Sequence, residues 1–310
     1  MTSPTSISAE KLTELWLSQT ESWELARNNF RALSNAHKRS IDIEGVTVGV
    51  QYNPGRLASV SSKPQVQMPN SCFLCRENRP QEQIGIGYAD EYTILVNPYP
   101  IFDRHFTIAA ATHTPQRMAG RMTHLLDLSK ACSPYTFFYN GARCGASAPM
   151  HMHFQAGNPG YLPIERQWRN AAKSEIASLP HAALYRIDGL LRSIFLLVAD
   201  SKSDALLLWE RLYHALPAPS GEEPMMNIVA RHEEGEWVLL VFPRSKHRPD
   251  CYYATGDTQY LISPGAVEMS GIFITPRGED YERLSAERVR EIYTEVSLTP
   301  EETALICRKL

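Results

Sequence analysis

The sequence predicts an α+β protein in which antiparallel sheets are flanked by helices. Three observations carry this prediction. Short segments are bounded by turn-forming residues, as strands are, and residues 46–52 alternate between apolar and polar side chains as a strand with one buried face does. Short turns connect most of these segments, and strands joined by short turns pair as antiparallel neighbours. Only a few stretches have the length and spacing of helices, so we expect the helices to cover one face of the sheet.

The predicted strands are short segments bounded by turn-forming residues such as Asn53-Pro54-Gly55. In chain order they cover residues 46–52, 92–96, 106–111, 136–140, 150–156, 226–231, 237–243 and 272–275. Residues 59–70 are rich in Ser, Pro and Gln, and we expect them to form a loop.

The predicted helices carry apolar residues at helical spacing, as Leu12, Leu15 and Trp16 do near the N-terminus. Thr114 followed by Pro115 has the residue types of an N-cap and a first helical turn. In chain order the helices cover residues 7–34, 114–130, 165–179, 202–216 and 286–295, and a short final helix opens at residue 299.

The composition limits the classes of function. The 310 residues carry a net charge of −3, so no overall positive field attracts nucleic acid. No run approaches the roughly 18 apolar residues that span a bilayer, and residues 1–6 lack the pattern of a secretory signal. The six cysteines are too sparse for a disulfide scaffold. We therefore expect a cytoplasmic protein that binds neither nucleic acid nor membrane.

Residues 151–155, His-Met-His-Phe-Gln, carry the strongest chemical signal. On a strand, His151, His153 and Gln155 share one face, and the apolar residues between them enter the core. A neutral imidazole is a competent nucleophile toward phosphorus when its other nitrogen is held as a donor. Gln155 can donate its amide to a phosphoryl oxygen but cannot deliver a proton. The small-residue loop 145–149 would let backbone amides approach that phosphate. The alternative is a solvent-exposed polar face without a role.

Cys72 and Cys75 have the spacing of a zinc half-site. A tetrahedral structural site needs two further ligands, which this spacing does not reveal. The alternative is a pair of buried free thiols that pack as small apolar residues.

Cationic side chains cluster directly after an apolar strand, where Arg244 and Lys246 lie within residues 242–248. One interpretation is a clamp that neutralises substrate phosphates. A solvated charged turn is the other. Arg56 is a further phosphate-binding candidate.

The histidine strand resembles the His-x-His-x-Gln signature of the transferase branch of the histidine-triad superfamily. That branch includes galactose-1-phosphate uridylyltransferase, the diadenosine polyphosphate phosphorylases and the GDP-hexose phosphorylases. Two further stretches agree with the branch in general, and two agree with GDP-L-galactose phosphorylase in particular. The two that agree with the branch are Asn97-Pro98-Tyr99-Pro100 with Arg104-His105-Phe106, and Tyr139-Asn140-Gly141 with Gly145-Ala146-Ser147. The two that agree with GDP-L-galactose phosphorylase are Leu162-Pro163-Ile164-Glu165, which follows the histidine strand, and Gln51-Tyr52-Asn53-Pro54-Gly55-Arg56.

The resemblance assigns roles to the residues of these motifs. It implies that His153 is the nucleophile, that His151 orients it, and that Gln155 assists transfer. It also implies that the transferred phosphate lies in a loop formed by Asn140, Gly145 and Ser147. Met150 is an extra residue compared with the family, which shifts the assignment of Ser147 by one position.

The resemblance also bears on the cysteine pair. Some uridylyltransferases carry a similar Cys-Phe-Leu-Cys that binds zinc together with a downstream histidine and the first histidine of the catalytic pair. The matching residues here are His113 and His151, which would complete a structural zinc site with Cys72 and Cys75. GDP-hexose phosphorylases lack the cysteine pair, so the chain combines features of two subfamilies.

The resemblance implies two histidine-triad-like halves in one compact unit, the second degenerate. We expect an N-terminal helical segment (1–45), a catalytic half (46–165) and a degenerate half (166–310). The expected reaction forms a nucleotidyl-histidine from a nucleoside diphosphate-sugar, GDP-hexose first, with phosphate or a sugar 1-phosphate as acceptor. Alternatives are a dinucleoside polyphosphate phosphorylase and a non-catalytic nucleotide-binding protein. Because dimers are common in the superfamily, a homodimer is a further expectation.

Overall fold

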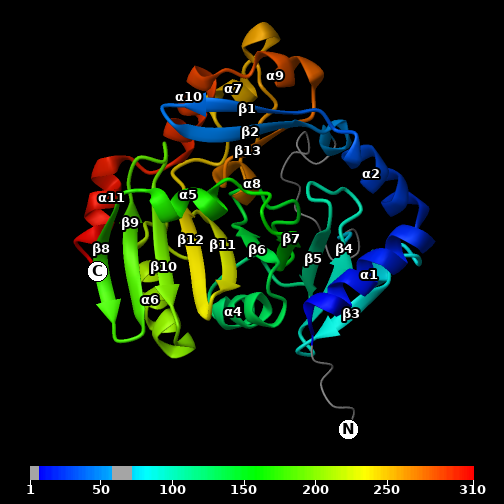
Figure 1. Ribbon diagram of the computed structural model, residues 1–310, viewed down its shortest axis with the longest axis horizontal. Coiled ribbons are helices and arrows are strands. Elements are labelled where there is room, and N and C mark those ends of the chain that lie inside the picture. Colours follow the sequence, from blue (N-terminus) through cyan, green and yellow to red (C-terminus); the bar gives the residue numbers. More distant parts are fainter. Residues whose placement is uncertain (1–6, 58–71) are drawn as a thin grey trace.

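A ten-stranded antiparallel sheet runs through the centre of the molecule, and a three-stranded sheet lies across one of its faces (Figure 1). The computed structural model describes residues 7–57 and 72–310. The loop predicted at residues 59–70 lies outside the described residues. The predicted α+β class, with antiparallel sheets and flanking helices, is confirmed.

The first half of the large sheet contains five strands. They are β3 (Gly85–Tyr88), β4 (Tyr92–Val96), β5 (His105–Ala110), β6 (Thr136–Asn140) and β7 (His153–Gly157). Their order across the sheet is β3-β4-β5-β7-β6, and helix α4 (Met122–Ala131) connects β5 to β6.

The second half repeats this topology from the opposite edge. Its strands are β8 (Lys173–Leu179), β9 (Ala182–Ile187), β10 (Ile194–Ala199), β11 (Met226–Glu233) and β12 (Glu236–Pro243). Their order is β8-β9-β10-β12-β11, and helix α6 (Lys202–Ala215) again connects the third strand to the fourth. The halves meet where β6 pairs with β11, with Asn140 opposite Asn227. At the outer edge, β8 has a register shift between Glu175 and Ala177.

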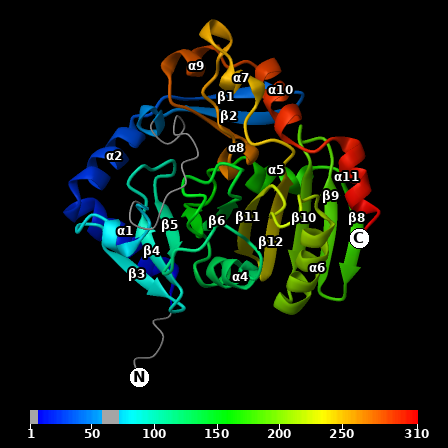
Figure 2. The same cartoon turned by 180° about the vertical axis from the view of Figure 1, so that it is seen from behind.

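Helices cover one face of the large sheet (Figure 2). There α1 (Ala9–Ser22) lies against β4, α4 against β11 and α6 against β10. Leu125 and Leu208 of these helices pack with Phe106, Phe154 and Leu239 of the strands in one buried apolar cluster. Full burial of such a side chain contributes about 1.5–3 kcal/mol, so this cluster fixes the helices on the sheet.

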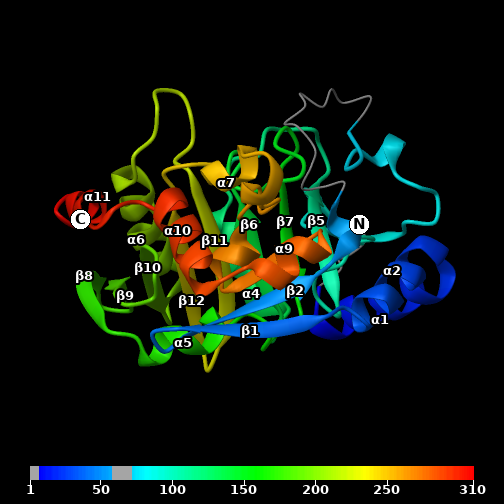
Figure 3. The same cartoon turned by 90° about the horizontal axis from the view of Figure 1, so that it is seen from above.

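The three-stranded sheet covers part of the opposite face (Figure 3). In it β2 (Val46–Tyr52) pairs antiparallel with β1 (Lys38–Ile43) and parallel with β13 (Ile272–Thr275). Helices α8 (Ala266–Met269) and α10 (Ala286–Val296) pack in the same apolar cluster. The remaining elements are α2 (Glu24–Ser34), α5 (Ile164–Asn170), α7 (Asp250–Tyr253), α9 (Gly278–Arg283), α11 (Pro300–Cys307), η1 (Pro54–Arg56), η3 (Arg76–Asn78) and η4 (Gly256–Thr258).

Some predicted bounds were wrong. The helix predicted at 7–34 is interrupted at Trp23, whose extended backbone ends α1. The helix predicted at 114–130 begins only at Met122, because residues 113–116 run beside the segment that precedes β7. Of the helix predicted at 165–179, α5 ends at Asn170 and the rest is the edge strand β8. The strand predicted at 150–156 begins at His153.

One row of paired residues shows how the two halves differ on the covered face. Gln155 of β7 pairs with Phe138, Phe138 with Val229, and Val229 with Leu240 of β12. Directly paired residues share a face of the sheet. The first half therefore presents polar side chains on β7, where β12 presents the apolar Val238, Leu240 and Phe242.

Candidate active site

His153 has the tautomer that a nucleophile needs. Its Nδ1 lies 2.8 Å from the backbone oxygen of His151. Since a carbonyl oxygen only accepts, Nδ1 carries the proton and Nε2 keeps its lone pair. Burial lowers the pKa of His153 to about 4, so the ring is neutral near pH 7. Nε2 is buried and makes no hydrogen bond with any described residue, which leaves its lone pair available to an electrophile.

Gln155 is oriented by a buried histidine. The backbone N–H of Ile101 donates to Nδ1 of His105 at 3.2 Å, and Nε2 of His105 donates to Oε1 of Gln155 at 2.9 Å. Burial, and then the positive charge of Arg56, lower the pKa of His105 to about 3, which keeps this ring neutral. Because its oxygen is engaged, the amide nitrogen of Gln155 remains as a donor. The sequence did not indicate this role of His105.

His151 faces the cysteine pair instead of sharing the surroundings of His153. Its Nε2 donates to the backbone oxygen of Ala110 at 2.8 Å, so its Nδ1 carries the lone pair. That Nδ1 lies 3.3 Å from Sγ of Cys72 and 3.5 Å from Sγ of Cys75. Nδ1 of His113 lies 3.2 Å from Sγ of Cys75. The four predicted ligands therefore come together, with their donor atoms within 4.8 Å of one another.

The chemistry of this cluster fits a divalent metal. Two sulfurs and two imidazole nitrogens form the donor set of many tetrahedral zinc sites. The carbonyl of Ala110 fixes the ring of His151, as partners outside the coordination sphere commonly do for metal-bound histidines. Burial, and then the neighbouring Cys72, raise the pKa of Cys75 to about 11, so the thiolate form needs a nearby cation.

The loop after β6 is held against the start of α8. Gly145 has φ +92°, and a Cβ atom there would lie 2.8 Å from Cα of Gly265, so this close approach requires glycine. Oδ1 of Asn140 accepts from the backbone N–H of Ala266 at 2.7 Å and from Nδ2 of Asn227 at 2.8 Å. These contacts fix the loop, while the predicted phosphate contacts of Asn140 and Gly145 stay predictions.

Ser147 and Arg56 come from different segments of the chain, the loop before β7 and the turn after β2. Ser147 is exposed in the loop before β7. Arg56 follows the end of β2 and donates to the backbone oxygen of Tyr99 at 3.3 Å. Its charge acts on His105 and also on the buried carboxyl of Glu268. The structure thus brings a cation toward the His105–Gln155 pair, and phosphate binding by Ser147 and Arg56 stays a prediction.

Arg244 and Lys246 are engaged with the protein. Arg244 is 3% exposed, and its guanidinium donates to Oδ1 of Asn227 at 2.7 Å and to backbone oxygens on several segments. The ammonium of Lys246 pairs with the carboxylates of Asp250 and Glu295. Arg244 thus connects the end of β12 to neighbouring loops, and phosphate binding by these two residues stays a prediction.

Gln116 lies beside His153, and no sequence motif pointed to it. Its side chain is 1% exposed and forms three hydrogen bonds with the backbones of β6 and β7. In sequence it is a polar residue within a stretch predicted as a helix. Its position depends on the non-helical path of residues 113–121, which sequence periodicity did not reveal.

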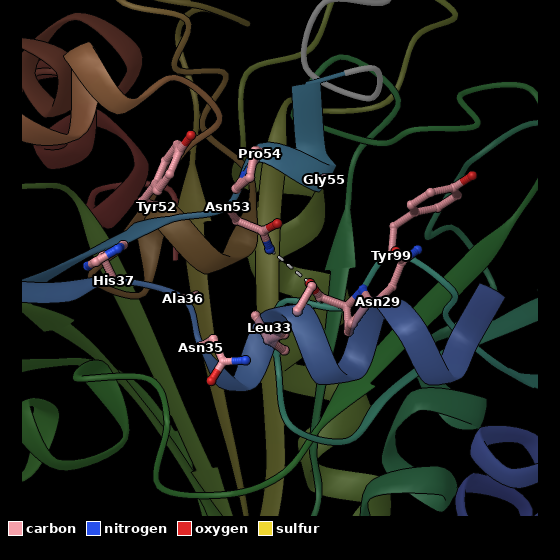
Figure 4. A pocket seen from close by; sticks show the side chains of 12 residues that line it. Asn29, Leu33, Asn35, Ala36, His37, Tyr52, Asn53, Pro54, Gly55 and Tyr99 are labelled. Atoms are coloured by element: carbon pink, nitrogen blue, oxygen red, sulfur yellow. Dashed lines mark hydrogen bonds between the residues drawn. The ribbon is translucent and has the colours of Figure 1, made fainter. Parts of the chain in front are cut away.

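A separate pocket of about 270 Å³ lies between α2, the end of β2 and residues 99–100. Figure 4 shows the amides of Asn29 and Asn53 and the ring of Tyr99 around it, and Asn53 donates to the backbone oxygen of Pro100 at 3.0 Å. The residues of the histidine strand do not line it. Gly55 in its wall directly precedes Arg56.

Comparisons with known proteins bear mainly on the fold. Residues 15–158, less than half of the chain, match the family described as domain of unknown function DUF4922. No curated protein sequence matches the chain. The crystal structure of yeast Ap4A phosphorylase Apa2 superposes with a TM-score of 0.60 and 15% identity, over 89% of this chain and 96% of that one. This similarity establishes a shared fold.

The same yeast enzyme is also similar in its liganded forms. Its complex with AMP has a TM-score of 0.59 and 16% identity, over 90% of this chain and 96% of that chain. Its complex with Ap4A has a TM-score of 0.58 and 16% identity, over 89% and 97%. In the described parts of this chain, no helix combines the length and apolar character that crossing a bilayer requires.

Proposed function

We propose that this chain is a nucleotidyltransferase of the phosphorylase type in which His153 forms a covalent nucleotidyl intermediate. The observation that carries the proposal is the buried lone pair on Nε2 of His153, beside an amide donor held in place by His105. A buried polar atom without a partner costs about 1–3 kcal/mol. A purely structural role of His153 would not explain why Nε2 is buried without a hydrogen bond, whereas a nucleophile requires that free lone pair.

The favoured substrate is a dinucleoside polyphosphate. The sequence put GDP-hexose first, but the fold is shared with an Ap4A phosphorylase over almost the whole length of both chains. With Ap4A, Nε2 attacks the α-phosphorus of one AMP unit and breaks its bond to the bridging oxygen, releasing ATP. Inorganic phosphate then attacks the adenylyl-histidine, restores the free imidazole and leaves as ADP. The reaction balances as Ap4A plus phosphate giving ATP plus ADP.

The surrounding side chains suit this chemistry. The amide of Gln155 donates to a phosphoryl oxygen as negative charge develops. ATP is a stable anion that leaves without being protonated, so an amide that cannot deliver a proton is sufficient here. Arg56, whose charge reaches His105, and the backbone amides of the loop around Gly145 would supply positive potential to the transferred phosphate.

Cys72, Cys75, His113 and His151 would hold a structural zinc ion. The ion would supply folding free energy and would keep two thiolates in a buried position. It would also tie the segment around Cys72 to His151, whose backbone oxygen holds Nδ1 of His153. No step of the proposed reaction takes place on the metal.

The covalent intermediate provides the test. The protein is incubated with Ap4A radiolabelled at the α-phosphate, without inorganic phosphate, then denatured and assayed for acid-labile, alkali-stable label. We expect label in the wild type and in the control His181→Ala, which removes an exposed histidine, and none in His153→Ala. Added phosphate should release the label as ADP.

A parallel incubation uses GDP-hexose radiolabelled at its α-phosphate. Faster labelling by GDP-hexose than by Ap4A would restore the substrate that the sequence favoured. Tight binding of either nucleotide without any covalent label would instead indicate a nucleotide-binding protein that does not catalyse transfer.

A further inference from the structure

The ladder between β6 and β7 stops just before His153. The strands pair at Thr136↔Gly157, Phe137↔Ala156 and Phe138↔Gln155. Continued in this register, Asn140 would lie opposite His153. The two strands instead separate there, so the backbone of His153 needs another partner, because a buried peptide group without a hydrogen bond is costly.

The side chain of Gln116 supplies that partner. Its Oε1 accepts from the backbone N–H of His153 at 2.7 Å, and its Nε2 donates to the backbone oxygen of His153 at 2.9 Å. The same Nε2 donates to the backbone oxygen of Asn140 at 2.8 Å. One amide thus makes for β7 the pair of bonds that a residue of a neighbouring strand would make, and it bridges the gap to β6.

The backbone around Gln116 is itself fixed to the segment before His153. Its N–H donates to the oxygen of Pro149 at 3.2 Å, and the oxygen of Thr114 accepts from the N–H of Met152 at 2.7 Å. The segment around Gln116 is therefore anchored to the chain on both sides of His151, directly before His153. Its side chain is almost fully buried, so water does not compete for these bonds.

We propose that Gln116 is the positioning residue of the nucleophile: its amide replaces β6 as the partner of β7 at His153 and thereby sets the direction of Nε2. The proposal rests on the proposed function. The backbone of His153 determines where its ring starts, and the bond from Nδ1 to the oxygen of His151 then fixes how the ring is turned. Displacing that backbone moves the attacking atom off the line of the phosphorus–oxygen bond.

The chemistry of this position requires an amide. It must accept one hydrogen bond and donate two, which only Asn and Gln among uncharged side chains of this shape can do. Met has a similar length and offers no donor. Glu accepts from the N–H of His153 but sets a carboxylate against two carbonyl oxygens.

The chain offers a matched control in Gln19. It is also fully buried, and its amide likewise bridges backbone groups, donating to the oxygen of Glu82 at 3.0 Å and accepting from the N–H of Ile84 at 3.0 Å. Gln19 lies on α1, on the helix-covered side of the sheet. Gln19→Met thus reproduces the structural loss without touching His153.

The test measures steady-state turnover of Ap4A and single-turnover labelling in Gln116→Met and Gln19→Met. We expect kcat of Gln116→Met to fall on the order of 100-fold, with KM changed less than about threefold, while Gln19→Met keeps both. An equal effect of the two variants, or an unchanged kcat in Gln116→Met, would overturn the proposal. If Gln116→Met does not fold, Gln116→Asn keeps an amide one methylene shorter, and the same fall in kcat is expected.

A second readout does not depend on turnover. Nitrogen NMR of histidine-labelled protein, assigned with His153→Ala, reports which ring nitrogen carries the proton. We expect a pure Nδ1–H form of His153 in the wild type and a mixture of tautomers in Gln116→Met. Identical spectra would reject the positioning role. Absence of any covalent label in the wild type would reject the proposed function. The NMR spectra of the wild type and Gln116→Met would still show whether Gln116 orients the ring of His153.

Discussion

The two halves of the large sheet place different chemistry on one row of paired residues. In the first half the row contains Thr107 and Gln155; on the counterpart strands of the second half it contains Leu196 and Leu240. Both halves have the same strand order and the same connecting helix. The topology therefore accepts either kind of side chain at this position. Under the proposed function, the first half uses this face to bind a substrate, whereas the second half buries it in an apolar core.

The same contrast extends to the supporting residues. Beside the first half lie the Cys72–His151 cluster and a histidine that orients Gln155. Among the described residues of the second half, no comparable group of metal-binding side chains occurs. The polar half thus depends on specific donors and acceptors, while the apolar half depends on packing, and each dependence can be broken separately.

Loss of the metal cluster should have the largest effect. Cys72→Ser removes one of four ligands, and metal analysis should show the zinc content falling from one per chain to near zero. We expect the free energy of unfolding to fall on the order of 5 kcal/mol, because structural zinc binds with about 10–16 kcal/mol at neutral pH. Cys251→Ser, which changes a buried thiol outside the cluster, is the control. Equal zinc content in both variants would rule the site out.

Leu240→Gln tests the apolar half. It buries an amide in the second half of the row, where Leu196 and Val229 are apolar, and an unpaired buried amide costs about 1–3 kcal/mol in addition to the lost apolar burial. We expect chemical denaturation to show a loss of at least about 3 kcal/mol, while the labelling rate per folded molecule stays near that of the wild type. A large loss of labelling in fully folded protein would show that the second half contributes to the chemistry.

Gln155→Leu makes the opposite exchange and gives the first half the chemistry of the second. Removing a donor to developing phosphoryl charge should lower kcat by about 100- to 1,000-fold. The lost hydrogen bond from His105 is partly offset by apolar burial, so the free energy of unfolding should change by less than about 2 kcal/mol. Activity assays and denaturation curves on the same sample measure both quantities. Retained activity would show that Gln155 does not take part in the mechanism.

The smallest expected effect concerns pH. The pKa of His105 is lowered to about 3, first by burial and then by Arg56, from an ordinary value of 6.5. Between these values the unfolded chain binds the proton and the folded chain does not, so stability is lost as the pH falls. In His105→Gln the slope of the unfolding free energy against pH should decrease by up to about 1.4 kcal/mol per pH unit. An unchanged slope between about pH 4 and 6 would contradict the neutral, buried state of His105.

Local sequence patterns predicted part of this molecule well. Short apolar segments bounded by turn residues identified several strands of the large sheet, such as β5 and β6, which are buried on both faces and therefore consist mainly of apolar residues. Resemblance identified the cysteines and histidines of the cluster, although they lie far apart in the chain. The roles of Gln116 and His105 were missed, since each depends on contacts with another segment of the fold.

Two regions show what tertiary structure decides and local patterns do not. Residues 173–179 contain good helix formers, yet they pair with β9 and form the edge strand β8. For Arg244 the sequence left open a phosphate clamp or a solvated turn, and in the fold this guanidinium is enclosed by acceptors from several segments. Neither outcome can be predicted from the sequence without knowing which segments contact one another in the fold.

The shape of β8 has a consequence for how copies of this chain meet. An unpaired edge strand is a template on which another chain can add a strand and start aggregation. The register shift between Glu175 and Ala177 interrupts that template, and the exposed charges of Lys173 and Glu175 oppose close backbone approach. The outer border of the second half thus opposes the addition of a strand from another chain at this edge of the large sheet.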